Sequence, residues 1–136
     1  MNQFASYTFS AFIALFLTLT APAALADEQP IQHRQVADIT DFDEAKQVFN
    51  ETTAEIKSIN TLNAETMHEI HMITYSLEKA IAYFVENMQG AQQKSAEKMA
   101  AVVELVHLGS ENNRKVETEI YLEEYFSLAE DFAAKM

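Results

Sequence analysis

The chain has 136 residues, of which 21 are acidic and 9 are basic, so its formal net charge is −12 at pH 7. A negative field of this size repels nucleic acid and anionic lipid surfaces, so nucleic acid is not expected as a partner, whereas cationic partners, including metal ions, are compatible with it. The sequence contains no cysteine. Disulfides, cysteine-ligated zinc, iron–sulfur clusters and covalently attached haem are therefore excluded as well.

The first 26 residues have the form of a secretory signal peptide. A nearly unbroken apolar run from Phe9 to Leu19 precedes Ala24-Leu25-Ala26, a small-x-small cleavage site, which Asp27 then follows. The apolar run is shorter than the roughly 20 residues that span a bilayer, which argues against an uncleaved anchor. We expect cleavage after Ala26 and export to a bacterial periplasm, with no membrane span in the mature chain.

The mature chain is predicted to be all-α. Its only glycines are Gly90 and Gly109, and both prolines lie before residue 31, so residues that break helices are nearly absent. Residues 27–39 are interpreted as a flexible leader. Residues 40–136 are interpreted as a single domain, large enough to bury a core without a disulfide.

Four helices are expected, at about residues 41–59, 63–89, 92–109 and 113–135, because apolar residues recur there at steps of three and four. Thr40 with Asp43 three residues later has the form of a capping box at the start of the first helix. The inward positions predicted from the spacing are Phe42, Ala45, Phe49, Thr52, Ile56, Ile59, Met67, Ile70, Thr74, Leu77, Ile81, Phe84, Met88, Met99, Val102, Val103, Val106, Ile120, Leu122, Tyr125, Phe126, Ala129, Phe132 and Ala133. The predicted fold is an up-down antiparallel four-helix bundle. The alternative is a three-helix bundle in which the last two helices form one long C-terminal helix through Gly109.

The second and third helices also carry a stripe of polar residues beside the apolar seam. If the chain reverses near Gly90, His107 lies level with about position 73 and Glu111 with about position 69, so the stripes meet within about 3 Å along the helix axis. Four side chains are then expected to converge, namely His68, His71, His107 and Glu111. Three more lie about one turn away, namely Tyr75, Glu78 and Glu104.

Three imidazoles and one carboxylate suit zinc or copper(II), which makes metal binding one interpretation of this cluster. The other interpretation is a buried hydrogen-bond network without a ligand. Haem is not expected. The chain length and topology are similar to those of the small b-type cytochromes, but their haem ligands are a Met of the first helix and a His of the last, and the corresponding helices here have neither.

No catalytic constellation is found in the sequence. The serines fit neither a nucleophile elbow nor a Ser-x-x-Lys arrangement, and no glycine-rich loop is present to hold phosphate. We therefore expect no enzymatic activity. Two functions stay open: binding of a metal ion or small ligand between the second and third helices, or a structural or protein-interaction role for an acidic helical face or the aromatic-rich last helix.

Two segments of the chain carry a resemblance. His71-x-x-Thr74-Tyr75-x-Leu77-Glu78 and Val106-His107-Leu108-x-Ser110-Glu111, together with Tyr121-Leu122, resemble the signature segments of an uncharacterised family of small exported bacterial proteins. The likeness covers roughly Glu65 to Glu124. It implies export and a helical fold, and it implies no known activity. The family pattern does not require a histidine at position 68, which makes His68 the least supported of the metal ligands.

Overall fold

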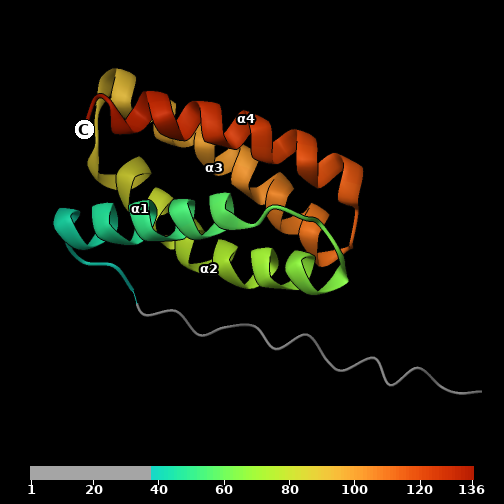
Figure 1. Cartoon of the computed structure of the whole chain (residues 1–136). Helices are drawn as coiled ribbons and strands as arrows, with labels where there is room; N and C mark the ends of the chain where they lie inside the picture. Colours follow the sequence, from blue (N-terminus) through green and yellow to red (C-terminus); the bar gives the residue numbers. More distant parts are fainter. Residues whose placement is uncertain (1–37) are drawn as a thin grey trace, which may run out of the picture. The chain divides into compact units, whose positions relative to one another are not determined.

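Residues 38–136, which the computed structural model describes, form four antiparallel helices joined by short turns (Figure 1). They are α1 (Phe42–Ser58), α2 (Ala64–Asn87), α3 (Gly90–Glu111) and α4 (Lys115–Ala133). The prediction of an all-α, four-helix bundle is confirmed. The predicted signal peptide, residues 1–26, lies outside the described residues. Within residues 38–136, none of the four helices combines the length and apolar character that crossing a membrane requires.

The first helix begins one residue later than the capping box predicted. Its N-cap is Asp41, whose side chain accepts a hydrogen bond from the Glu44 backbone N–H at 2.9 Å. The Glu44 carboxylate in turn accepts from the Thr40 N–H at 3.2 Å. The predicted pairing of Thr40 with Asp43 is therefore wrong by one position. An aspartate caps as well as a threonine does, and its charge also favours the helix N-terminus.

The turn between α2 and α3 is short because of Gly90. The backbone φ of Gly90 is +64°, in the left-handed region that glycine adopts without steric cost. The chain reverses there as predicted, and α3 begins at once. The polar stripes of α2 and α3 are thereby brought side by side.

The third helix does not end at Gly109, as the sequence had indicated, but continues to Glu111. Asn113 takes the left-handed conformation with φ +53°. The N–H groups of Asn113 and Arg114 donate to the carbonyls of Ser110 and Gly109 at 3.1 and 2.8 Å, which is a Schellman motif. This motif separates α3 from α4, so the alternative with one long C-terminal helix is wrong.

The largest fully buried side chains of the core include aromatic rings from α1, α2 and α4. Phe84 of α2 contacts Phe49 of α1 and Phe132 of α4, with ring centroids 5.8 and 5.2 Å apart. Tyr125 of α4 is fully buried, and its hydroxyl shares a 2.5 Å hydrogen bond with Thr53 of α1. These contacts hold α1 and α4 to the hairpin between them.

Most predicted inward positions are buried or partly buried, with three exceptions. Phe42 is 37% exposed, Ile120 is 56% exposed, and Ala133 is also exposed. Thr118, which the apolar spacing passed over, is fully buried in place of Ile120. Apolar residues lie on several sides of α4, so their spacing alone does not select which side faces inward.

Candidate functional site

The polar cluster lies between α2 and α3. His71, Tyr75 and Glu78 share one face of α2 because they are three or four residues apart. His107 of α3 enters this face, and its ring centroid lies 4.7 Å from that of His71 and 4.8 Å from that of Tyr75. Both ring pairs are nearly perpendicular, at 81° and 83°, so each presents an edge to a face.

Two oxygen atoms of α2 face the Nδ1 atom of His107. Glu78 Oε1 lies 2.8 Å away and Thr74 Oγ1 lies 3.2 Å away. The Thr74 hydroxyl donates its proton to the His71 carbonyl at 2.7 Å, so its lone pairs are directed at His107. We therefore assign the ring proton of neutral His107 to Nδ1, which leaves the lone pair on Nε2.

Burial and neighbouring charges both act on the acids of the cluster. Burial raises the pKa of Glu78, while His107 opposes this shift and Glu104 adds to it. The pKa of Tyr75 is raised by burial and then by the charges of Glu111 and Glu78. The His107 and Glu78 side chains are 13% and 29% exposed, so their contact is partly shielded from water.

The second histidine of the cluster lies deeper. His71 is 1% exposed, and its Nε2 is 3.3 Å from the Tyr75 hydroxyl. The ring of His68 stacks beside it, with centroids 6.2 Å apart and an interplanar angle of 28°. His68 itself is exposed on the surface of α2.

The structure brings together four of the predicted residues, His71, Tyr75, Glu78 and His107. Glu78 contacts His107 directly, although it was expected about one turn away. The other two predicted acids act on the cluster through their charges. Glu111 raises the pKa of Tyr75, and Glu104 raises the pKa of Glu78. Thr74 had been assigned only to the apolar seam. The one signal that pointed to its polar role was its place in the His-x-x-Thr-Tyr segment.

In the part of the chain that the structure describes, no three His, Asp or Glu side chains come close enough to hold a metal ion. The contacts of the cluster are hydrogen bonds and ring contacts within α2 and between α2 and α3. The metal interpretation of His71, His107, Glu111 and His68 stays a prediction. His33, the fourth histidine of the chain, lies outside the described range.

A family model described as a family of unknown function, DUF6746, matches residues 1–134 of the chain. The chain belongs to this family. The match spans almost the whole sequence and confirms the resemblance to an uncharacterised family. No curated protein matches the chain, and no solved structure matches it. Membership in DUF6746 assigns no activity.

Proposed function

We propose that this chain is an exported, non-enzymatic helical module that works by binding another molecule. In this proposal the His/Glu cluster is a hydrogen-bonded clasp that fixes α3 against α2. The binding surface then lies elsewhere on the bundle, and the clasp keeps that surface in one shape.

The observation that carries the proposal is the double contact of His107 Nδ1 with Glu78 Oε1 and Thr74 Oγ1, at 2.8 and 3.2 Å. Hydrogen bonds to charged groups are worth about 1.5 to 3 kcal/mol when they are shielded from water, and removing one partner leaves the other without its bond. A contact of this kind between two helices sets their rotation and register, which apolar packing alone specifies less sharply.

A double-mutant cycle tests the clasp. Glu78→Ala, His107→Ala and the combined variant are each unfolded with urea, and the coupling free energy is taken from the four values of the free energy of unfolding. We expect a coupling of about 1 to 3 kcal/mol. The matched control is the exposed ion pair of Lys79 and Asp38, for which the coupling should be much smaller. Equal coupling in the two pairs would remove the argument for a clasp.

A second candidate function is binding of zinc or copper(II), and one feature of His107 favours it. Because Glu78 accepts from Nδ1, the lone pair on Nε2 is held in a fixed direction, as it is in histidines that ligate metals. His71, 4.7 Å away between ring centroids, and Glu111 would complete such a site. The Tyr75 hydroxyl would have to move away from His71 Nε2.

Calorimetric titration of metal-stripped protein with zinc or copper(II) separates the two candidates. The clasp alone predicts no saturable binding that depends on His107. Binding lost in His107→Ala but kept in His33→Ala would establish the metal site instead. Such a ligand would also raise the free energy of unfolding, by about 2.7 kcal/mol at 100 times its dissociation constant.

A further inference from the structure

The bundle is closed on three sides and open on the fourth. α1 packs on α2, α2 on α3 and α3 on α4, whereas the backbones of α1 and α4 barely approach each other. Only side chains join them, chiefly the Thr53 and Tyr125 hydroxyls and the rings of Phe49 and Phe132, 5.8 Å apart. In a closed four-helix bundle this seam would be packed like the other three.

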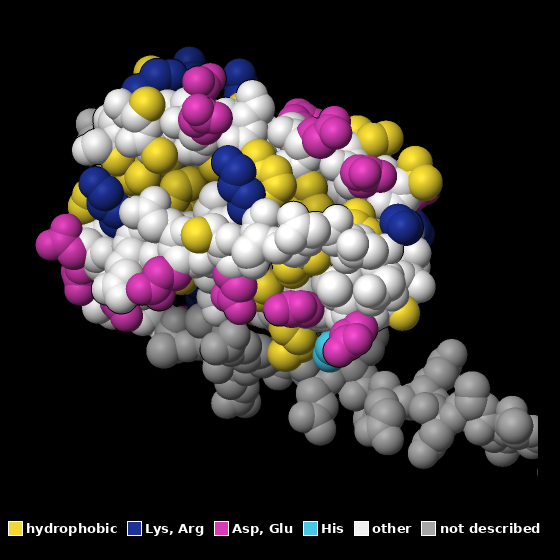
Figure 2. All heavy atoms as spheres, in the orientation of Figure 1, with side chains coloured by type: hydrophobic (Ala, Val, Ile, Leu, Met, Phe, Trp, Pro, Cys, Tyr) yellow, Lys and Arg dark blue, Asp and Glu magenta, His cyan; other side chains and the backbone are white. Residues whose placement is uncertain are grey.

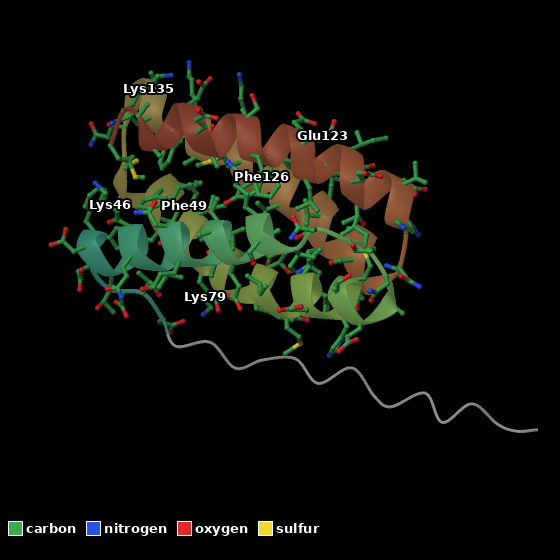
Figure 3. The ribbon with its side chains drawn as sticks, viewed as in Figure 1. Lys46, Phe49, Lys79, Glu123, Phe126 and Lys135 are labelled. Atoms are coloured by element: carbon green, nitrogen blue, oxygen red, sulfur yellow. The ribbon has the colours of Figure 1, made fainter. Side chains whose placement is uncertain are left out.

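Two cavities occupy the open seam, and Phe126 of α4 lines both of them. The first, of about 350 Å³, lies by the α1–α2 turn and is lined on its apolar side by Ile59, Leu62 and Leu122. The second, of about 370 Å³, is lined by Ala54 of α1 among others. We call the two cavities together the α1–α4 groove. Figure 2 shows it as a hollow with a hydrophobic floor between the two helices, and Figure 3 shows Phe126 directed into it from α4.

Residues two helical turns apart on α4 line the two cavities. Leu122 lines the first cavity and Ala129 the second, and these residues are seven apart on α4, or about 10.5 Å along its axis. Side chains at positions i and i+7 of a helix that lies along the groove have the same separation. Helical peptides dock in apolar grooves through anchors at this spacing.

The two helices that border the groove carry a net negative charge, which favours a positively charged occupant. α4 carries six acidic residues and one lysine, and α1 carries four acidic residues and two lysines. Three glutamates line the cavities themselves and form what we call the acidic rim, namely Glu119, Glu123 and Glu130, and two lysines, Lys115 and Lys57, line them as well. The Nζ of Lys57 lies 5.9 Å from the centre of the Phe126 ring, so this cation is placed over an aromatic face. The acidic rim repels a fatty-acid carboxylate, an anionic membrane and a second copy of the same face.

We propose that the α1–α4 groove binds a basic amphipathic helix of a partner protein, whose apolar side chains at i and i+7 enter the two cavities while its lysines or arginines face the acidic rim. This inference rests on the proposed binding function and adds the chemistry of the partner. It does not use the contacts of the His/Glu cluster. Failure of the groove experiment therefore leaves the clasp cycle unaffected, and the converse also holds.

The probe is a synthetic peptide of about 18 residues, long enough to form a helix on binding, with leucines on one face and lysines on the other. Two comparison peptides carry glutamates in place of the lysines, or the same composition in an order that scatters the leucines. Fluorescence anisotropy of the labelled peptides with protein purified after expression of the full chain should show binding of the first peptide only. Affinity should fall as salt is raised, because the rim charges are screened.

Matched variants locate the binding. Ala54→Trp fills the second cavity and should weaken binding at least about tenfold, which is about 1.4 kcal/mol. Ala101→Trp, at an exposed site on α3, should leave the affinity unchanged. Reversal of two rim charges, Glu119→Lys with Glu123→Lys, should weaken binding. The control, Glu69→Lys with Glu97→Lys, changes the net charge equally on α2 and α3, away from the groove, and should weaken binding less. Thermal unfolding of each variant shows that the fold is retained.

Several outcomes would overturn the proposal. They are equal binding of the lysine and glutamate peptides, equal binding of the scattered peptide, unchanged affinity in Ala54→Trp, and no binding at all. A dimer in light scattering that Ala54→Trp dissociates would assign the groove to a second copy. Binding to lipid vesicles that the same variant abolishes, without peptide binding, would assign it to a membrane.

Discussion

The buried phenol of Tyr125 makes the stability of the fold depend on pH in the alkaline range. Burial raises its pKa far above the ordinary 10.0, and the hydrogen bond with Thr53 only partly opposes this. Because the folded-state pKa is the higher one, the stability contributed by the neutral phenol is fully present below about pH 10. It is lost as pH rises above that value, where the unfolded chain releases the proton first.

Urea unfolding at a series of pH values from 9 upward measures this effect. Above about pH 10 the free energy of unfolding should fall by about 1.4 kcal/mol per pH unit through Tyr125 alone. Tyr125→Phe should remove that component, so its curve should be shallower by the same amount. Parallel curves for the two proteins would show that the phenol ionises without cost to the fold.

The polar cluster could be predicted from the sequence, but its individual contacts could not. The polar stripes of α2 and α3, with a turn at Gly90, predicted that His107 lies near His71 and Tyr75. The structure has His107 in contact with both rings. Whether His107 reaches Glu78 of α2 depends on the turn to within one residue, because one residue changes the direction of a side chain by about 100° and its height by about 1.5 Å. Apolar spacing carries no information at that precision.

The contact between α3 and α4 depends on the absence of a side chain at Gly109. A Cβ atom there would lie 2.5 Å from the Oγ1 atom of Thr118, which is fully buried and donates to the Arg114 carbonyl at 2.9 Å. Gly109→Ala should therefore destabilise the protein by about 1 to 3 kcal/mol, although alanine favours a helix by about 1 kcal/mol over glycine.

A substitution at Thr118 should relieve the clash between the added Cβ atom and the Thr118 hydroxyl. Thr118→Ala removes the hydroxyl, so Gly109→Ala should cost less in that background than in the wild type, as measured by thermal or urea unfolding. A gain in stability for Gly109→Ala alone would mean that α3 and α4 are not held at this distance. The role of Gly109 was hidden in the sequence, since a glycine near a helix end indicates a stop more often than a close approach.

At the scale of the whole chain, export is the prediction to be measured first. When the full chain is expressed in a bacterium with a periplasm, the exported protein should begin at Asp27, and intact-mass spectrometry identifies that terminus. Ala26→Phe should block cleavage, because the cleavage site needs a small residue there. Ala23→Val lies outside the small-x-small pair and is the control. Exported protein that still contains residues 1–26 would contradict the assignment.

The bundle itself could be predicted because the determinants of its helices are local: few glycines and prolines, and apolar residues at steps of three and four. The open seam between α1 and α4 could not be predicted in this way. The distance between α1 and α4 depends on contacts between residues far apart in the chain, namely Thr53 with Tyr125 and Phe49 with Phe132. Such a distance depends on how rings from remote segments fit, and no spacing rule within one helix reports it.

The order in which the helices pack also bears on how the chain folds. Each helix rests mainly on the next one along the sequence, so most packing contacts join consecutive helices. Little loop-closure entropy is then lost before those contacts form. Helical bundles whose contacts join neighbouring segments of the chain fold in about microseconds to milliseconds. The same open seam that leaves Phe126 partly exposed thus also leaves few contacts between the first and last helices to assemble.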